Sequence, residues 1–364
     1  MPWHILVPVS SAELGGSQIF LLRLHDALRD GEWRFSFWLF ADGPLADALQ
    51  QRGAEMKIFP RTWQRTPLGL WRLDHEMKAS QPHAIYLHAS RSLAWLAKRR
   101  NIPCVERINM SRGAGAGGWC SWPWLDRLCT NWNTKIVAVS NAIAAQMARR
   151  GIARDKIVVI RNFVEIERFH RPDERYARRR ALGIPDDAIV VLNLGRLVAQ
   201  KGQEVFWQAA RICLAADQRL WFVMAGDGPL AAALGAQAQA LGSRALLLPF
   251  QAEPSGLYAA ADILLHTAHW EPLANVILEA MAARLATVAT NVDGTPEVIA
   301  HRVTGLLFPA ADFRRAAALV LELAQDADLR QRLACAAQEW ARTYASPSVT
   351  LDAYRRLFRD LAQR

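Results

Sequence analysis

Cysteine is scarce in this chain, and its spacing excludes two kinds of structural site. The cysteines are an odd number with no C-x2-C pair: Cys104, Cys120, Cys129, Cys213 and Cys335. The pattern therefore provides neither a disulfide framework nor a zinc-binding ligand set. We expect reduced, mostly buried thiols in a cytoplasmic protein, and no zinc site.

Long apolar runs are missing as well. No stretch approaches the roughly 18 apolar residues that a membrane-spanning helix needs. Residues 1–7 follow a strand pattern, without the basic segment, apolar core and cleavage site of a signal peptide. We expect a protein that works on the cytoplasmic side and reaches a membrane only at its surface.

Negative charge is depleted in the first half only. Residues 1–162 hold 22 Lys or Arg against 12 Asp or Glu, whereas the rest holds 22 of each, so the first half carries the whole net charge of +10. A solubility bias is one explanation, and an anionic partner is the other. No recognised nucleic-acid motif is present, so nucleic acid is not expected. An anionic membrane surface or a phosphorylated glycolipid fits better.

Short apolar runs alternate with helical patterns along the whole chain. The strands expected in the first half are residues 4–9, 34–40, 55–59, 84–88, 104–107, 135–139 and 156–161. Those expected in the second half are residues 188–195, 219–225, 245–248, 261–267 and 286–290. This alternation predicts an α/β protein with two doubly wound parallel sheets.

The expected boundaries follow from the same pattern. An N-terminal Rossmann-like domain covers residues 1–162, a second one covers residues 163–347, and residues 162–172 form the linker. The last stretch, residues 348–364, is a basic amphipathic helix. Ligands of open parallel sheets bind at the carboxyl ends of the strands, so two such sheets facing each other would form a cleft.

Two carboxylates lie in residues 266–284, HTAHWEPLANVILEAMAAR. Glu271 and Glu279 are eight positions apart, on either side of a predicted helix start. Pro272 suits a first helical turn, where a missing N–H is no loss, and good helix formers continue over residues 273–281. Glu271 would therefore lie at the mouth of a strand, and Glu279 about two turns into the helix.

The start of this helix predicts an anion site. The N–H groups of Leu273, Ala274 and Asn275 would point outward between the two carboxylates. A helix N-terminus binds phosphate, and carboxylates accept hydrogen bonds from sugar hydroxyls. The segment therefore suits a phosphate flanked by two sugars.

The E-x7-E spacing resembles that of retaining glycosyltransferases with the GT-B fold, specifically glycosyltransferase family 4 (glycosyl transferases group 1). Further segments resemble the family's motifs in the expected order: residues 11–17, 137–140, 156–162, 195–197 with 201–202, 225–229 and 291–297. The resemblance covers nearly the whole chain. It implies two Rossmann-like domains facing across a cleft, with the terminal helix packed back on the first.

On the donor side, the resemblance implies catalytic roles for Arg196, Lys201 and Glu271. The two cations would neutralise the diphosphate as it gains charge, in place of a metal ion. Glu271 would hold hydroxyls of the transferred sugar, and Glu279 would hold the nucleotide ribose. From composition alone, each could equally be a solvated surface charge or a carboxylate favoured near a helix start.

Two glycine loops complete the expected donor site. Gly15 and Gly16 precede a helix, and the family uses this loop against the donor phosphate and the acceptor. Glycine lets the backbone approach a ligand closely. Gly226 and Asp227 belong to a segment that resembles a nucleotide-binding turn. A plain turn is the alternative for both loops.

His88, Arg107 and Asn109 lie at predicted strand ends and are expected on the acceptor or sugar side. Relatives often carry a histidine where Asn109 stands, so a candidate acid or base is missing and we name no general base. A lone His88 could also be structural. Family members are thought to retain configuration by same-face attack, with the leaving phosphate oxygen taking the acceptor proton.

Two departures from the family pattern lie near the donor site. Asp293 stands where relatives usually have glycine, which could alter the preference for the donor sugar. Ala274 stands where many have glycine or another small residue, so the backbone contact should survive. The single D-x-D, residues 326–328, lies between predicted helices and indicates a helix start rather than a metal site.

Residues 113–132 alternate glycine with alanine and then carry four tryptophans. A glycine loop followed by a packed helix is one interpretation, and a mobile acceptor loop with an aromatic surface is the other. Basic runs at residues 61–72 and 98–100 would suit anionic lipid. We therefore expect peripheral attachment to the inner face of the cytoplasmic membrane.

Together these features predict a retaining, metal-independent glycosyltransferase without a cofactor. Its expected partners are a nucleotide diphosphate sugar and a lipid-linked or lipopolysaccharide-type saccharide. Two alternatives stay open: a nucleotide-sugar 2-epimerase-like GT-B enzyme, and a non-catalytic carbohydrate- or membrane-binding scaffold. Missing acid–base residues at the strand ends argue against the first, and the intact charged motif residues argue against the second.

Overall fold

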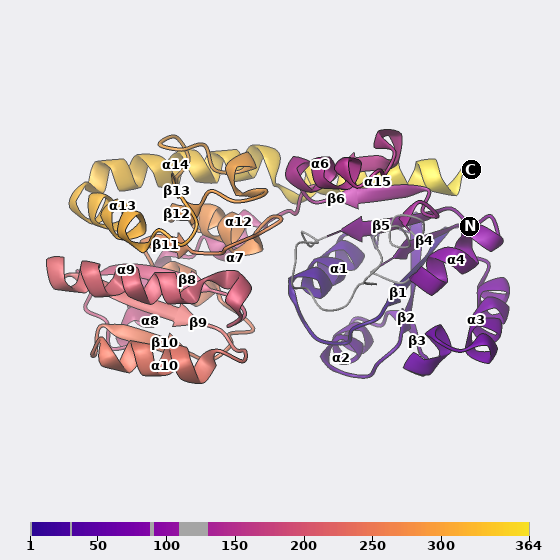
Figure 1. The fold of residues 1–364 in the computed structure, drawn as a ribbon, viewed down its shortest axis with the longest axis horizontal. Helices are drawn as coiled ribbons and strands as arrows, with labels where there is room; N and C mark the ends of the chain where they lie inside the picture. Colours follow the sequence, from indigo (N-terminus) through magenta and orange to yellow (C-terminus); the bar gives the residue numbers. More distant parts are fainter. Residues whose placement is uncertain (1, 30, 88–90, 109–129, 364) are drawn as a thin grey trace. The chain divides into compact units, whose positions relative to one another are not determined.

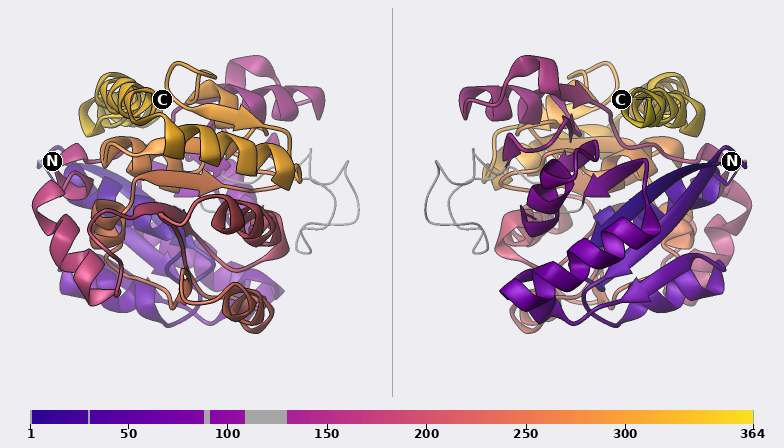
Figure 2. Two further views of the ribbon diagram at one scale, coloured as in Figure 1. Left: turned by 90° about the vertical axis from the view of Figure 1, so that its left-hand side faces the viewer. Right: turned by 90° about the vertical axis from the view of Figure 1, so that its right-hand side faces the viewer.

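The computed structural model describes residues 2–29, 31–87, 91–108 and 130–363. The chain divides into two compact units (Figure 1). The first comprises Met1–Asn162 with Thr350–Arg364, and the second comprises Phe163–Val349. Each unit is built on one parallel sheet with helices packed on it (Figure 2). The predicted fold class, two Rossmann-like parallel sheets, is confirmed.

The sheet of the first unit has the strand order β3-β2-β1-β4-β5-β6-β7. Its strands are β1 Trp3–Val9, β2 Trp33–Leu39, β3 Glu55–Ile58, β4 Ala84–Leu87, β5 Cys104–Ile108, β6 Lys135–Ala138 and β7 Ile157–Val159. Its helices are α1 Gly16–Ala27, α2 Pro44–Gln51, η1 Arg61–Gln64, α3 Pro67–Ser80, α4 Arg91–Arg99, α6 Asn141–Arg149 and η2 Arg154–Lys156. Strands β1, β4 and β5 are almost wholly buried, which explains their continuous apolar character.

The C-terminal helix α15 (Pro347–Ala362) packs on the first unit from Thr350 onward. The hydroxyls of Tyr354 and Tyr86 lie 3.0 Å apart inside this packing. The Phe358 ring contacts Trp33 with ring centroids 5.7 Å apart. At the surface, Arg359 forms a two-pronged ion pair with Glu32. The apolar stripe of the helix therefore completes the core of the first unit.

The sheet of the second unit has the order β10-β9-β8-β11-β12-β13. Its strands are β8 Ile189–Leu194, β9 Leu220–Ala225, β10 Ala245–Leu248, β11 Ile263–His266, β12 Ala286–Thr290 and β13 Leu306–Phe308. Its α-helices are α7 Ile166–Phe169, α8 Arg175–Ala181, α9 Gln203–Ala216, α10 Ala231–Ala240, α11 Ser255–Ala260, α12 Asn275–Ala282, α13 Phe313–Gln325 and α14 Ala327–Tyr344. Its short 3-10 turns are η3 Pro172–Glu174, η4 Ala199–Lys201 and η5 Thr295–Glu297. The sequence did not predict β13, because three apolar residues are too few for a recognisable strand pattern.

Residues 162–172, predicted as the linker, pack on the second unit from Phe163 onward. Phe163, Val164 and Phe169 are buried. The Val164 N–H donates to the Ala345 carbonyl at 2.8 Å, and the Phe169 ring meets Tyr258 edge-on with centroids 5.4 Å apart. The segment belongs to the second unit because its apolar side chains find a core there.

Side-chain caps explain where several helices begin. Thr66 accepts a hydrogen bond from the Gly69 N–H at the start of α3, and Ser140 accepts one from Ile143 at the start of α6. Asp312 and Asp326 cap α13 and α14 in the same way. The D-x-D of residues 326–328 is therefore a helix start, as predicted.

Three cysteines lie in the described part of the chain: Cys104, Cys213 and Cys335. All three are free thiols, and the first two are buried. Burial raises the pKa of Cys104 and of Cys213 to about 12, which keeps both thiols protonated and unreactive. Cys120 and Cys129 lie outside the described residues.

Both sheets reverse their strand order at an inner pair of strands. In the first unit the reversal lies between β1 and β4, and in the second it lies between β8 and β11. Ligands of doubly wound sheets bind at the carboxyl ends of such pairs. The loops that follow β8 and β11 are therefore where a ligand of the second unit is expected.

Asp262 is the buried polar anchor of the second unit. Its carboxylate accepts hydrogen bonds from Arg175 (2.6 Å), from Arg179 (2.7 Å) and from the Val190 N–H (2.8 Å). The Arg179 side chain is fully buried and also donates to three backbone carbonyls. Asp262 thus joins α8 to the sheet immediately before β11.

Replacing Asp262 with alanine should destabilise the second unit strongly. The change leaves the buried Arg179 charge without its carboxylate, which typically costs about 3–5 kcal/mol. The midpoint of thermal unfolding should fall by roughly 10 °C, since 1 kcal/mol corresponds to about 2–4 °C in a unit of this size. Glu322→Ala, which breaks an exposed pair with Arg302, is the control and should change little. Similar shifts in both variants would contradict the assigned role.

Candidate active site

The loops that follow β8 and β11 are locked together at Gly202. Gly202 has φ +58°, and a Cβ on it would lie 2.3 Å from the Thr267 carbonyl oxygen, so only glycine fits. The Thr267 hydroxyl donates to the Lys201 carbonyl at 3.0 Å, and the His269 N–H donates to the Gln200 carbonyl at 2.9 Å. These contacts bring the two loops of the switch point side by side.

Lys201 and Glu271 form an ion pair across this junction. Lys201 Nζ donates to Glu271 Oε2, and the side chains are only 17% and 9% exposed. Burial alone would raise the pKa of the Glu271 carboxyl, but the charge of Lys201, with His266 and Arg196 nearby, lowers it overall. Glu271 is therefore a carboxylate at neutral pH. The sequence predicted these residues for one site, and the structure brings them together.

His266 is a member of this cluster that the sequence analysis missed. It is the last residue of β11, it is 2% exposed, and its Nε2 lies 3.7 Å from Glu271 Oε2. Burial lowers the pKa of His266 to about 4, so the ring is neutral at pH 7. Nε2 has no hydrogen-bond partner among the described residues. Such a buried polar group typically costs about 1–3 kcal/mol.

Arg196 lies on the same loop as Lys201, and its backbone is fixed from two sides. Gln203 Nε2 donates to the Arg196 carbonyl at 2.8 Å, and the neighbouring Leu197 N–H donates to the Asp227 carbonyl at 2.8 Å. The Arg196 side chain is exposed. Its positive charge contributes to lowering the pKa of the Glu271 carboxyl, so the field of Arg196 reaches the Lys201–Glu271 pair.

The loop containing Gly226 and Asp227 has a structural reason for its glycine. A Cβ on Gly226 would lie 1.9 Å from the Gly195 carbonyl oxygen, which no side chain could tolerate. Asp227 Oδ1 accepts a hydrogen bond from the Gly228 N–H at 2.7 Å. This loop supports the backbone that carries Arg196; direct binding of a nucleotide by it stays a prediction.

A pocket of about 430 Å³ adjoins this loop. It lies at the carboxyl ends of β9 and β10 and has mainly apolar walls. Its lining residues are Leu197, Gly226, Asp227, Ala231, Leu247, Leu248, Pro249 and Phe250. Sequence reasoning named only two of these, because residues 247–250 show no pattern beyond the end of a strand.

The helix after Glu271 begins later than the sequence predicts. α12 starts at Asn275, so Leu273 and Ala274 lie before it, and both have buried side chains. Ala274 occupies the N-cap position without a side-chain cap. Pro272 lies in the loop and not in the first turn of the helix, because Leu273 and the extended Ala274 separate it from Asn275.

Glu279 consequently lies just over one turn into α12, not two. Tyr258 Oη donates to Glu279 Oε2 at 2.8 Å, and the tyrosine itself is buried. The partner of Glu279 is thus a neutral hydroxyl, whereas the partner of Glu271 is a cation. The two carboxylates of the motif are held in different ways.

Asp293 replaces the expected glycine for a reason visible in its backbone. Its φ is +41°, in the left-handed region that favours glycine and tolerates aspartate. Its Oδ2 accepts a hydrogen bond from the Glu271 N–H at 2.9 Å, and the Gly294 N–H donates to the Glu271 carbonyl at 3.3 Å. Asp293 therefore fixes the backbone of Glu271.

The residues predicted in the first unit are only partly described. Gly15 caps α1, and Gly16 is its first residue, with no side-chain cap on the helix. The φ of Gly15 is −102°, so its backbone does not require glycine. His88 and Asn109 lie outside the described residues, as do residues 113–129 of the tryptophan-rich segment.

Arg107 is buried in the interior of the first unit, 5% exposed. Its guanidinium donates to Asn162 Oδ1 and stacks 3.9 Å from the centre of the Phe20 ring. These contacts tie β5 to α1, so the structure assigns Arg107 a packing role. Contact with an acceptor or sugar stays a prediction.

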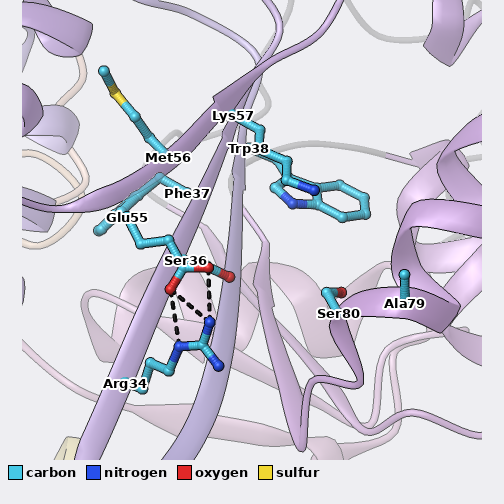
Figure 3. Close-up of a pocket in the computed structure, with 9 residues that line it drawn as sticks. All are labelled: Arg34, Ser36, Phe37, Trp38, Glu55, Met56, Lys57, Ala79 and Ser80. Carbon is cyan, nitrogen blue, oxygen red and sulfur yellow. Dashed lines mark hydrogen bonds and ion pairs between the residues drawn. The ribbon is translucent and has the colours of Figure 1, made fainter.

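A second pocket, of about 250 Å³, lies on the first unit over β2, β3 and the end of α3 (Figure 3). Arg34 and Glu55 form an ion pair across its wall, as the dashed lines in Figure 3 show. The pocket is lined by β2, β3 and the end of α3 and by none of the predicted site residues. It is therefore separate from the candidate site.

The pKa of His266 predicts a pH dependence of stability. Its value of about 4 in the folded protein lies below the ordinary 6.5, so the unfolded chain binds more protons between these values. The contribution of His266 is therefore complete above pH 6.5 and is lost as the pH falls towards 4. Going from pH 7 to pH 5 should cost about 2 kcal/mol of unfolding free energy.

The variant His266→Leu should lack this component, which denaturant unfolding at both pH values would measure. His4 and His25 also have pKa values lowered by burial, but they contribute equally to both proteins. An identical acid loss in wild type and variant would show that His266 is not its source.

Comparison with known proteins agrees with this geometry. Residues 14–168 match the family described as Glycosyltransferase Family 4, and residues 174–340 match the one described as Glycosyl transferases group 1. The lipopolysaccharide core biosynthesis glycosyltransferase LpsD of Rhizobium meliloti (strain 1021) is 30% identical over 339 residues, covering 88% of this chain and 94% of LpsD.

Solved structures resemble the whole chain. HepE of Anabaena, in complex with UDP and glucose, aligns with a TM-score of 0.86 at 23% identity over 98% of this chain and 99% of HepE. WaaG, a glycosyltransferase involved in lipopolysaccharide biosynthesis, aligns with a TM-score of 0.71 at 18% identity over 96% of this chain and 98% of WaaG. These likenesses confirm the GT-B fold. The matched families and the full-length similarity to LpsD show that the chain belongs to glycosyltransferase family 4 and is a glycosyltransferase.

Proposed function

We propose that this enzyme moves a sugar from a nucleotide diphosphate sugar to a lipid-linked or lipopolysaccharide-type saccharide, with retention and without a metal ion. The carrying observation is the cluster of Arg196, Lys201 and Glu271 at the switch point of the second sheet. Two cations beside a carboxylate suit a diphosphate that continues into a hydroxyl-bearing sugar.

The donor would lie along the loops of the second unit. Its diphosphate would meet Arg196, Lys201 and the uncapped start of α12. Glu271 would accept hydrogen bonds from the transferred sugar, and Glu279, already held by Tyr258, would accept them from the ribose. The apolar pocket beside Gly226 would take a flat nucleobase.

Transfer needs no protein nucleophile on this proposal. The bond from the anomeric carbon to the phosphate oxygen breaks, and the electron pair leaves with the diphosphate. Arg196 and Lys201 stabilise that charge as it develops. The acceptor hydroxyl bonds to the same face of the anomeric carbon and passes its proton to the leaving phosphate oxygen. Configuration is thereby retained.

The acceptor class is supported by relatives and by charge. LpsD is named for lipopolysaccharide core biosynthesis, and WaaG for lipopolysaccharide biosynthesis. The net positive charge of this chain lies entirely in the first half, which suits an acceptor that carries phosphate or lies at an anionic surface.

The first unit also offers a surface suited to an anionic bilayer, the α3–α4 surface, formed by the outer faces of α3 and α4 with residues 58–66, which lead into α3. The inner faces of the two helices share one core, and Arg100, just after α4, forms an ion pair with Asp74 of α3. The exposed apolar side chains of this α3–α4 surface are Ile58, Leu68, Trp71 and Trp95. Its exposed cations are Arg61, Arg65, Arg72, Lys98 and Arg99.

Charge on the α3–α4 surface is strongly one-sided. Residues 56–100 hold nine Lys or Arg and two Asp or Glu. Both acids already have partners, since Asp74 pairs with Arg100 and Glu76 pairs with Lys57. In the part of the chain that the structure describes, no helix has the length and apolarity to cross a bilayer. We propose peripheral attachment through the α3–α4 surface on the cytoplasmic face.

A panel of UDP-, GDP-, ADP- and CMP-sugars should identify the donor by thermal shift. One sugar nucleotide should stabilise the wild-type protein, by about 2.7 kcal/mol at 100 times its Kd. EDTA should change neither this shift nor the rate of transfer. Arg196→Ala and Lys201→Met should each lower transfer by roughly 100- to 1,000-fold, because each removes a charge that meets the leaving group.

Arg302→Ala is the matched control, since Arg302 is an exposed arginine of the same unit. NMR of the product should show the donor's anomeric configuration. Loss of activity in EDTA would overturn metal independence, and an inverted product would overturn retention. A wild-type protein that responds to no sugar nucleotide would overturn the donor site itself.

Binding to vesicles should depend on the cations of the α3–α4 surface. Changing Arg61, Arg65 and Arg72 together to glutamine should weaken binding to phosphatidylglycerol-containing vesicles by roughly 100-fold, at about 1 kcal/mol for each charge. Neutral phosphatidylcholine vesicles should bind either protein poorly. Sedimentation of protein with vesicles measures both.

Three exposed arginines of the second unit, changed to glutamine, give the same loss of net charge: Arg211, Arg315 and Arg332. That control should bind vesicles nearly as well as wild type. Equal weakening in both triple variants would contradict a localised surface and indicate a response to net charge alone.

A further inference from the structure

His266 lies close to Glu271, but the donor site as proposed gives it no role. It is buried at the end of β11, and the proposed chemistry assigns it no bond to substrate. Its Nε2 lies 3.7 Å from Glu271 Oε2. That separation is too long for a hydrogen bond. Nε2 has no other partner among the described residues.

The oxygen that His266 faces is already occupied. Lys201 Nζ donates to the same Glu271 Oε2. A donor diphosphate brings negative charge to Lys201 and competes with Glu271 for its ammonium group. When Lys201 turns toward the phosphate, Glu271 Oε2 loses its partner at the moment when the carboxylate must hold the sugar.

We propose that His266 is a positioning residue. When the donor draws Lys201 away, His266 replaces it as the hydrogen-bond partner of Glu271 Oε2. The ring donates its Nε2–H to the carboxylate, which then keeps its orientation toward the hydroxyls of the transferred sugar. This exchange of partners rests on the proposed donor site and deepens it. It explains why a buried histidine lies close to Glu271 without a hydrogen bond to it.

A neutral histidine suits this role better than a second cation. Burial lowers the pKa of His266, so its ring presents an N–H without a fixed charge. The charged groups that face it are Glu271 and Lys201. A permanent cation there would hold Glu271 in a closed pair and would repel Lys201, whereas a neutral donor only orients the carboxylate.

The surroundings fix the backbone that carries His266. β11 pairs with β12 through His266 and Ala289, and Asn193 Nδ2 donates to the preceding Leu265 carbonyl at 2.7 Å. The Glu271 backbone is fixed separately by Asp293. A small rotation of the Glu271 side chain therefore suffices to close the gap, with no movement of the backbone.

The test compares binding of a sugar nucleotide with binding of its nucleotide diphosphate. The ligands are UDP-glucose and UDP, or GDP-mannose and GDP if the panel selects that base, measured by calorimetry. His266→Leu should weaken binding of the sugar nucleotide by about 10-fold, which corresponds to the loss of a hydrogen bond to a charged group. The affinity for the nucleotide diphosphate should not change. His266→Gln, which keeps an N–H donor, should recover most of the loss.

His269→Leu is the control, because His269 lies in the same loop but bonds Glu204 instead of Glu271. It should bind both ligands as wild type does. His266→Leu should melt at pH 7 no lower than wild type, since it removes a buried unpaired group. In ¹⁵N-histidine NMR, the donor should shift Nε2 of His266 in the wild-type protein, and UDP or GDP alone should shift it less.

The outcomes distinguish failure of the partner exchange from failure of the proposed donor site. Equal weakening of sugar nucleotide and diphosphate by His266→Leu would overturn the partner exchange, because the histidine would then act through the fold. Unchanged binding of both would overturn it as well and leave the donor site intact. A wild-type protein that binds no sugar nucleotide would overturn the donor site and the exchange together.

Discussion

The buried ion pair between Lys201 and Glu271 is the interaction around which the second unit is arranged. Taking two charges out of water costs free energy that their attraction barely recovers, so such a pair is poor evidence of stabilisation. Its presence at a switch point is better explained by ligand chemistry. Gly202 permits the close approach of the two loops, and Asp293 and Gln203 fix their backbones.

The choice of lysine at position 201 runs against the composition of its surroundings. Residues 163–364 contain 21 arginines and a single lysine. A guanidinium would pair with Glu271 through a rigid two-pronged fork. An ammonium is a compact charge with three rotatable donors, so it can leave a carboxylate for a phosphate with little rearrangement. The one lysine of residues 163–364 stands where the proposed exchange requires a cation that can change partners.

Local pattern predicted most of the fold, because buried parallel strands and their helices leave periodic signals. It failed where the signal is short or non-local. β13 has three residues, α12 starts two residues later than Pro272 suggests, and residues 162–172 are buried by a core that lies far away in the sequence. Glu271, Glu279, Arg196 and Lys201 were recognisable from spacing and family resemblance. His266 was not, because a single histidine at a strand end carries no pattern.

The E-x7-E spacing by itself does not reveal how its two carboxylates differ. Glu271 is held by a cation and by a carboxylate that fixes its backbone, whereas Glu279 is held by the hydroxyl of Tyr258. These partners come from the loop after β8, the loop after β12 and α11, so only the folded chain brings them together. The spacing therefore predicts that there is a site, and the tertiary contacts assign the roles within it.

Three departures from ideal structure in the second unit lie around Glu271. Asp293 adopts a left-handed backbone conformation, His266 buries a polar atom without a partner, and Lys201 and Glu271 bury opposite charges. Each feature costs free energy where a hydrophobic or glycine alternative would not. By contrast, the buried charge of Arg179 is fully satisfied by Asp262 and backbone carbonyls. The same unit thus satisfies its buried charge at the amino end of β11 and tolerates unfavourable groups at the carboxyl end. Selection for ligand binding rather than for stability would produce this difference.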